Sequence, residues 1–268
     1  MTDPVLLAVA HGSRDERAAP ALDRLIERVR AGAPEVDVRL SYVDHTSPSV
    51  TRALEDLSTR PTVVVPLLLT AASHTKGDVA AAVRAARRPD RHLHQARPLA
   101  PHPGLLAALD RRLDEAGVDR RTAVVLAAVG SADPDANADV VADARRLWEW
   151  RRASAPVEAG FASATTPTVA EAVDRLRRLG YDEVAVAAYA LAPGRLLDKA
   201  TAGLDVATVT EELADTPEAA EVVLERYREA IAGDIRMGCD TCLYRVGWPG
   251  REDRQGAPQR VHPHPDDA

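Results

Sequence analysis

Residues 63–69 read VVVPLLL, a run of apolar residues only, and the chain then turns polar over 70–78, TAASHTKGD. A strand without polar residues must be covered on both faces, as strands of parallel sheets are. Residues 5–15, VLLAVAHGSRD, repeat this arrangement, with an apolar run that ends in a histidine and a glycine. The two stretches therefore predict buried parallel strands, each followed by a polar loop.

Similar apolar runs alternate with stretches of helical periodicity along the whole chain. We expect strands at 5–10, 36–43, 62–69, 93–98, 122–129, 156–161, 183–191 and 205–210. We expect helices at 15–31, 48–58, 78–87, 102–116, 135–153, 167–179, 194–203 and 216–232. This alternation is typical of a doubly wound α/β fold, in which helices cover both faces of a parallel sheet. Ser47 or Ser49 around Pro48, and Thr166 before Pro167, predict capped helix starts with proline in the first turn.

The chain also repeats itself. VLLAVAHGSRD at 5–15 matches VVLAAVGSADP at 124–134, and residues 63–78 match VAVAAYALAPGRLLDK at 184–199. Each half holds four strand–helix units, so the sequence predicts two tandem flavodoxin-like modules related by internal duplication. We expect module boundaries at 1–117 and 118–236, followed by a tail at 237–268 that is rich in Gly, Pro, His and charged residues.

Composition excludes several classes of protein. A chain of 268 residues with 46% hydrophobic residues can form a substantial core. Its net charge of −7, with acidic and basic residues interleaved, argues against nucleic acid as a partner. No apolar stretch approaches the roughly 18 residues of a membrane span, and the N-terminus lacks the pattern of a signal peptide. We therefore expect a cytoplasmic protein that binds neither nucleic acid nor membrane.

Two histidines, His11 and His74, follow the first and third expected strands. Ligands of open parallel sheets bind at the carboxyl ends of strands, where the strand order reverses, so the two imidazoles are expected to face one cleft. Imidazole binds transition-metal ions and accepts protons near pH 7. The second half has Val129 and Arg195 at the equivalent positions. We infer that the first half carries the chemistry and the second serves as scaffold or lid; the alternative is that each histidine is an ordinary loop residue.

Other polar residues near these strand ends have narrower interpretations. Gly12 allows the backbone to approach a ligand closely, and Ser13 is expected to cap the helix that begins near residue 15. His45 could join the site through Asp44, although a capping or loop role is favoured. We assign no role to the histidines at 92, 94 and 102.

Several alternative chemistries lack their motifs. HGSR at 11–14 is not the G-x-S-x-G sequence of an esterase. GSADPDANAD at 130–139 lacks the glycine and glutamate of a calcium loop, so a capped helix start is the better interpretation. The glycine-rich sequences of nucleotide-binding loops are also missing.

Four stretches carry a resemblance to a known family: HGSRD at 11–15, PLLLTAASHTKGD at 66–78, GSADPDANAD at 130–139 and YALAPGRLLDKA at 189–200. They resemble the class II tetrapyrrole chelatases and, within these, the sirohydrochlorin chelatases CbiX and SirB in their long two-module form. The resemblance covers about 1–236. It implies that Fe²⁺ (for siroheme) or Co²⁺ (for a cobalamin precursor) is inserted into sirohydrochlorin without ATP and with release of two protons. It also implies that His11 and His74 are the active-site histidines.

The physical chemistry of this reaction suggests further site residues. A cleft between two modules can grip and bend the macrocycle, while His11 and His74 hold the incoming ion or accept protons. Sirohydrochlorin carries eight carboxylates, which call for cationic and polar partners. Our candidates for substrate binding are Ser13, Arg14, Lys76 and Arg195. The alternative for each cation is an ordinary solvated surface charge.

MGCDTC at 237–242 places Cys239 and Cys242 in a C-x-x-C motif. It resembles the M-x-C-x-x-C near the end of some long family members, where the motif is linked to an iron–sulfur cluster. A [4Fe–4S] cluster takes four thiolates, so it would need a partner chain, in a homodimer formed through this region, or ligands other than cysteine. Zinc held with His262 and His264, or a reversible dithiol, are the alternatives.

Two other functions fit the same residues. One is a metal or tetrapyrrole carrier that binds without turnover. The other is an α/β enzyme whose strand-end histidines perform acid–base chemistry without a metal. Multiple turnover with sirohydrochlorin would exclude the first, and failure to bind any tetrapyrrole would favour the second.

Overall fold

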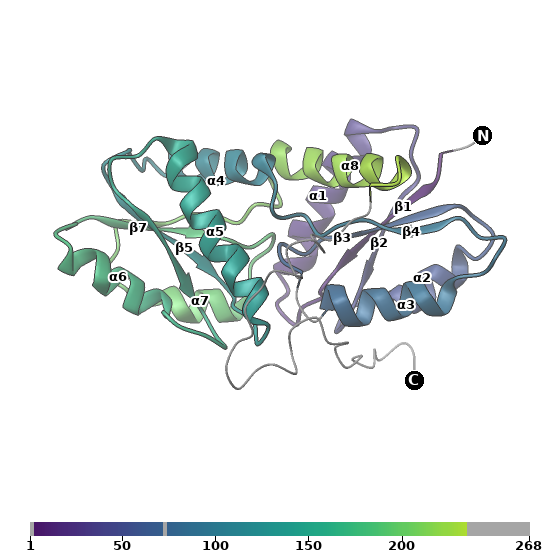
Figure 1. The fold of residues 1–268 in the computed structure, drawn as a ribbon, viewed down its shortest axis with the longest axis horizontal. Coiled ribbons are helices and arrows are strands. Elements are labelled where there is room, and N and C mark those ends of the chain that lie inside the picture. The colour runs from purple at the N-terminus through teal and green to yellow at the C-terminus, as the bar shows by residue number, and fades with distance from the viewer. Residues whose placement is uncertain (1–2, 72–73, 235–268) are drawn as a thin grey trace.

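The structure, a computed structural model, describes residues 3–71 and 74–234, except for the side chains of residues 74–76. It contains two four-stranded sheets with the orders β2-β1-β3-β4 and β6-β5-β7-β8, and every strand pair is parallel. The two sheets stand side by side with helices on both faces (Figure 1). The expected fold class, two α/β modules related by duplication, is confirmed.

The strands lie where the apolar runs predict them, although most are shorter. The first sheet holds β1 (Val5–Ala10), β2 (Val38–Tyr42), β3 (Thr62–Pro66) and β4 (Leu93–Gln95). The second holds β5 (Ala123–Ala128), β6 (Val157–Phe161), β7 (Val184–Ala188) and β8 (Thr208–Val209). The helices are α1 (Ala18–Gly32), α2 (Val50–Asp56), α3 (Ala80–Ala86), α4 (Pro103–Glu115), α5 (Pro134–Arg151), α6 (Val169–Arg178), α7 (Arg195–Thr201) and α8 (Pro217–Ile231). A short π-helix, η1 (His74–Val79), leads into α3.

Two expected helix starts differ from the structure. Ser49 caps α2, but α6 is capped by Thr168 rather than by Thr166. Pro48 and Pro167 each precede the capping residue instead of lying in the first turn. In both cases the capping residue forms a bridge to the end of the preceding strand, so the proline belongs to the connection and not to the helix.

Ser13 does not cap α1, which begins at Ala18. Its Oγ instead accepts a hydrogen bond from the backbone N–H of Asp15 at 3.0 Å. The carbonyl of Asp15 accepts from the N–H of Ala18 at 3.0 Å, and this turn delays the start of the helix. Residues 130–139, in contrast, form the predicted capped start, with Asp133 as the N-cap of α5.

Complete burial of the central strands follows from their sequences. In β1, Leu6 and its alternate neighbours face a core cluster that also contains Leu126 of β5, whereas Leu7 faces a separate cluster beneath α2 and α3. Both faces of the strand are therefore covered, which explains why VLLAVA contains no polar residue. The cluster shared by the two sheets also includes Leu109 of α4 and Leu224 of α8.

The fourth helix of each repeat lies on the sheet of the other repeat. α8 packs against α1, β3 and β4, while α4 packs against α5 and β7, and the two helices also contact each other (Figure 1). Each sheet thus needs a helix from the other half of the sequence to cover one of its faces. The packing therefore links the two halves, for which 1–117 and 118–236 remain the predicted bounds, into one core.

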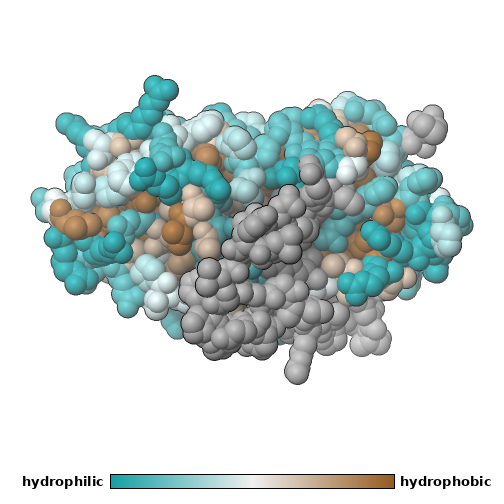
Figure 2. Space-filling model, viewed as in Figure 1, coloured by the Kyte–Doolittle hydropathy of each residue, from teal (hydrophilic) through white to brown (hydrophobic). Residues whose placement is uncertain are grey.

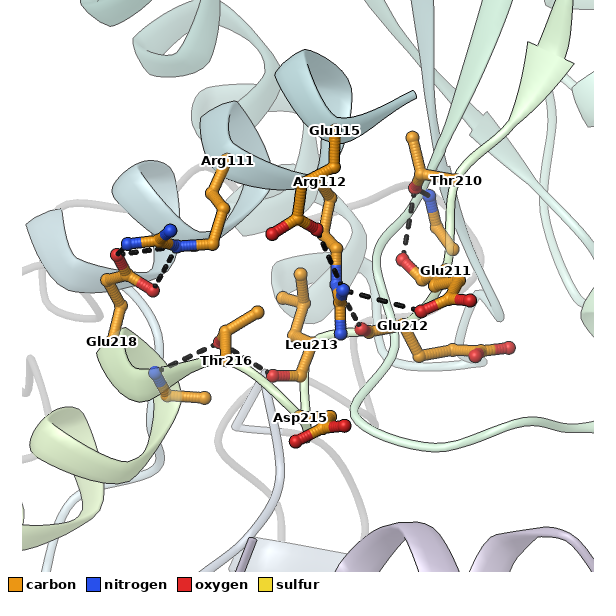
Figure 3. A network of polar contacts seen from close by, with 12 residues as sticks. Arg111, Arg112, Glu115, Thr210, Glu211, Glu212, Leu213, Asp215, Thr216 and Glu218 are labelled. Atoms are coloured by element: carbon orange, nitrogen blue, oxygen red, sulfur yellow. Dashed lines mark hydrogen bonds and ion pairs between the residues drawn. The ribbon is translucent and has the colours of Figure 1, made fainter. Parts of the chain in front are cut away.

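This packing of α4 and α8 on each other's sheets is an exchange of helices between the repeats. Two arginines at equivalent positions of the repeats stabilise it. Arg226 of α8 donates to the three carbonyls of residues 98, 99 and 101 at 2.8–2.9 Å. Arg112 of α4 donates to the carbonyl of Glu212 at 2.9 Å, on the segment that leads into α8. Figure 3 shows Arg112 between this segment and Glu115 of its own helix.

The surface in Figure 2 is mainly hydrophilic, with small apolar patches scattered over both halves. Within residues 3–71 and 74–234, no helix combines the length and the apolar character needed to cross a lipid bilayer.

Candidate functional site

A cavity of about 870 Å³ lies between the two repeats, at the carboxyl ends of their central strands. Most of its lining comes from the segments that follow β1 and β3 in one sheet, and β5 and β7 in the other. The strand order reverses between β1 and β3, and again between β5 and β7. The cavity therefore lies where two topological switch points meet, the ligand-binding position of open parallel sheets.

His11 follows β1 directly and lines this cavity. Its carbonyl accepts a hydrogen bond from the N–H of Asp44 at 2.8 Å, and its Nδ1 lies 3.1 Å from the carbonyl oxygen of Gly12. Gly12 has a φ of 87°, and a Cβ at this position would lie 1.6 Å from the carbonyl oxygen of Asp44. The loop that presents the imidazole therefore requires glycine, because any side chain would push it away from the end of β2.

His74 is the first residue of η1. β3 ends at Pro66 rather than at residue 69. Beyond it, the N–H of Leu67 still donates to Val9 of β1, and the carbonyls of residues 68 and 69 accept from residues 99 and 100. His74 is therefore farther from its strand than expected. The side chains of His74 and Lys76 lie outside the described part of the structure, so their predicted roles stay predictions.

Arg14 and Arg195 come from opposite repeats, and both line the cavity, as does Ser13. Nη2 of Arg195 donates to the carbonyl oxygen of Arg14 at 3.4 Å, which links the two repeats beside the cavity. Arg14 and Arg195 are both exposed residues. The structure thus places His11 and three of the predicted substrate-binding residues around one space.

Arg17, which sequence analysis did not select, forms a second link between the repeats. It donates to the two carboxylate oxygens of Asp15 at 2.9 and 2.6 Å, and also pairs with Asp198 of α7. The hydrogen bond from the Arg17 side chain is the main cause that lowers the pKa of Asp15 to about 2. Asp15 therefore stays ionised, and the link is a fixed charge pair at neutral pH.

His45 also lines the cavity, although its sequence context favours a loop role. Its Nδ1 lies 3.2 Å from Oδ1 of Asp44, and the same oxygen accepts the N–H of His45 at 2.7 Å. His45 thus lines the same cavity as His11, and a role in the site through Asp44 stays a prediction.

The second repeat contributes polar groups that sequence analysis also missed. The Asn137 side chain accepts from the N–H of Ser131 at 2.9 Å and donates to the carbonyl of Ser131 at 2.8 Å. The hydroxyl of Tyr189 donates to Asp143 at 2.6 Å, and burial raises the pKa of Tyr189 well above its ordinary value. Asn137 thereby fixes the backbone of Ser131 in the loop after β5, and both residues line the cavity.

A complete metal site is not formed by the described side chains. Within that part of the chain, no group of three or more His, Cys, Asp or Glu residues is arranged to hold an ion. The predicted ligand His74 has no described side chain, and Cys239 and Cys242 lie in the segment 235–268, outside the described residues.

Known proteins with similar sequences fall in one group. A sirohydrochlorin cobaltochelatase of Priestia megaterium is 28% identical over 261 residues, which cover 90% of this chain and 85% of that protein. A sirohydrochlorin ferrochelatase of the same organism is 25% identical, over 72% of this chain and 75% of that protein.

Solved structures agree with these relatives. SirB from Bacillus subtilis with Fe³⁺ superposes with a TM-score of 0.72 and 25% identity, over 87% of this chain and 98% of that chain. CbiX described as the terminal enzyme of siroheme biosynthesis in denitrifying bacteria has the same fold, with a TM-score of 0.62, 20% identity and coverage of 84% and 99%. The CbiX family model matches residues 5–116 and matches again over residues 123–230. With both repeats matched, this chain belongs to the CbiX family.

Proposed function

We propose that this protein is a sirohydrochlorin chelatase, which inserts Fe²⁺ or Co²⁺ into the macrocycle without ATP. The observation that carries the proposal is the cavity between the repeats, where an imidazole of the first repeat meets arginines of both. Family membership and the two Priestia megaterium relatives support this chemistry. Imidazole ligands accept several first-row ions, so the residues do not favour iron over cobalt.

In the proposed reaction the protein positions a ring and an ion, both of which are substrates. Arg14 and Arg195 bind peripheral carboxylates, with Ser13 and Lys76 as further partners. His11 and His74 bind the incoming ion as it loses water, and they accept the two protons that leave the pyrrole nitrogens. The first repeat carries this chemistry, and the second closes the cavity from the opposite side.

The test follows the absorbance of sirohydrochlorin with Fe²⁺, Co²⁺ and Ni²⁺ in turn, under anaerobic conditions and with the tetrapyrrole in excess over protein. We expect repeated turnover with at least one of the first two ions. Stoichiometric binding without turnover would identify a carrier and contradict the proposal. No binding of sirohydrochlorin would favour a metal-independent α/β enzyme.

A variant of His11 makes the assay specific. We expect His11→Gln to lower kcat about 100-fold, because the amide can neither accept a proton near pH 7 nor replace imidazole as a ligand. Sirohydrochlorin binding is retained, since the arginines remain. His94→Gln is the matched control, because His94 is exposed on β4 and is not among the residues that line the cavity. If the kcat of His11→Gln equalled those of His94→Gln and the wild type, His11 would have no role in the mechanism.

For the C-terminal motif we propose a [4Fe–4S] cluster bound by Cys239 and Cys242 of two copies of the chain, since one copy has two of the four thiolates. No step of the reaction depends on this group. Iron and acid-labile sulfide analysis of anaerobically purified protein tests it, together with the oligomeric state; a metal-free protein would leave the dithiol, and zinc alone would favour the Cys and His site. Separately, we propose that the protein is located in the cytoplasm.

A further inference from the structure

The two walls of the cavity differ in chemical character. The first repeat contributes charged and polar side chains, among them His11, Arg14 and His45, together with apolar residues such as those at 67–69. The wall from the second repeat is mostly alanine, glycine and larger apolar residues. Its polar lining residues are Ser131, Asn137, Tyr189 and Arg195.

Three of these four polar side chains form hydrogen bonds within the second repeat. Ser131 Oγ accepts from the N–H of Asp133 at 3.0 Å, Asn137 binds the backbone of Ser131, and Tyr189 donates to the buried Asp143. The polar capacity of this wall is therefore largely used inside the protein. Among the described side chains of this wall, Arg195 is the charged one, and most of the others are apolar.

Two large apolar side chains on this wall are exposed. Val129 is 41% exposed and Leu196 is 51% exposed, and both line the cavity. Val129 occupies the position in the second repeat that His11 has in the first, while Leu196 adjoins Arg195 at the start of α7. Covering an exposed apolar side chain with a ligand is energetically favourable, so these two side chains are suited to contact an apolar surface.

We propose that Val129 and Leu196 form an apolar platform for one flat face of the tetrapyrrole, which leaves the opposite face turned toward His11. This inference rests on the proposed function. The faces of the macrocycle are apolar and its carboxylates lie at the periphery, so a platform beside Arg195 contacts the ring and an edge carboxylate at adjacent residues. Val129 and Leu196 are then positioning residues, and they determine from which side the metal ion enters.

The test replaces each platform residue by a neutral polar one, because an added negative charge would repel the substrate carboxylates. Val129→Asn and Leu196→Asn are compared with Val141→Asn and Leu179→Asn. These controls change side chains that are 53% and 60% exposed and are not among the cavity-lining residues. All four positions are exposed, so each variant is expected to fold like the wild type, which circular dichroism checks.

The readouts are the Kd of sirohydrochlorin without metal, by fluorescence titration, and the KM of each substrate. We expect each platform variant to weaken sirohydrochlorin binding about tenfold, which corresponds to about 1.4 kcal/mol. The KM for Co²⁺ stays unchanged, and both control variants bind like the wild type.

Ionic strength separates the platform from the arginines. The loss in Val129→Asn and Leu196→Asn persists at high salt, because apolar contact is not screened, whereas the loss in Arg195→Gln shrinks. Wild-type-like affinity in both platform variants, or a change confined to the KM for Co²⁺, would overturn the inference. If the wild type itself does not bind sirohydrochlorin, the proposed function fails instead.

Discussion

Arg17 connects the two repeats through two carboxylates, Asp15 beside it in the first repeat and Asp198 on α7 in the second. Because hydrogen bonds from Arg17 lower the pKa of Asp15 to about 2, the ionised form is favoured by folding. This contribution is complete above the ordinary pKa, about 4, and is lost as the pH falls from about 4 to 2. The free energy of unfolding that this charge pair contributes should therefore decrease as the pH falls through this range.

We expect Arg17→Gln to unfold at lower urea concentration than the wild type at pH 6, with the two proteins converging as the pH approaches 2. Urea unfolding at a series of pH values between 6 and 2 measures this. Arg52→Gln is the control, since the pairs of Arg52 with Glu55 and Asp56 on α2 are exposed. A constant difference between Arg17→Gln and wild type across the whole range would show that the pKa of Asp15 does not depend on Arg17.

Some residues that line the cavity can be located from the sequence alone. His11, Arg14 and Arg195 each follow an apolar run, so the sequence predicts that they lie at the ends of strands. The repeat supports this, because it aligns His11 with Val129 and Arg195 with His74. Arg17 and Asn137 could not be found in this way, because their partners are defined only by the folded loops. A serine before a helical pattern is the usual signal of a helix cap and predicts that role for Ser13, yet the turn at Asp15 intervenes.

At the scale of elements, periodicity predicted which segments are strands and helices, but not which sheet each helix covers. The amphipathic pattern of a helix indicates only that one of its faces is buried, and not against which sheet. Short connections would favour packing on the nearest sheet. The exchange of α4 and α8 breaks this expectation. A sign of it lies in the equivalent arginines at 112 and 226, which are nearly buried and bond to carbonyls of the opposite repeat.

From the exchange of α4 and α8 we predict how much these two arginines contribute to stability. Arg226→Leu leaves three carbonyl groups without their donor, so we expect a loss of at least about 3 kcal/mol in the free energy of unfolding. Arg112→Leu removes the donor of one carbonyl and should cost about 1–2 kcal/mol.

Chemical denaturation of the purified variants measures both values. Arg111→Leu is the matched control, because Arg111 is the neighbouring residue on α4 and its pair with Glu218 is partly exposed, so a loss below about 1 kcal/mol is expected. Equal effects in all three variants would mean that the carbonyl bonds of Arg226 do not hold the exchange together.

At the scale of the whole molecule, the duplication suggests two units, but the core does not separate into two. One cluster contains residues of both sheets together with α4 and α8, and each sheet has in addition a cluster of its own on the outer face. Removing either repeat would strip the fourth helix from the sheet of the other. Two sequence repeats are therefore expected to unfold as one cooperative unit, although independent modules would unfold in separate steps.

Equilibrium unfolding with two probes tests this expectation. Trp148 and Trp150 lie on α5, so in a Trp248→Phe background their fluorescence reports the second repeat, while far-ultraviolet circular dichroism reports the helices of both. We expect one transition with coincident midpoints, because the first sheet cannot keep α8 once the second repeat unfolds. A circular dichroism curve with two steps, only one of which coincides with the fluorescence change, would show that the shared core does not couple the repeats.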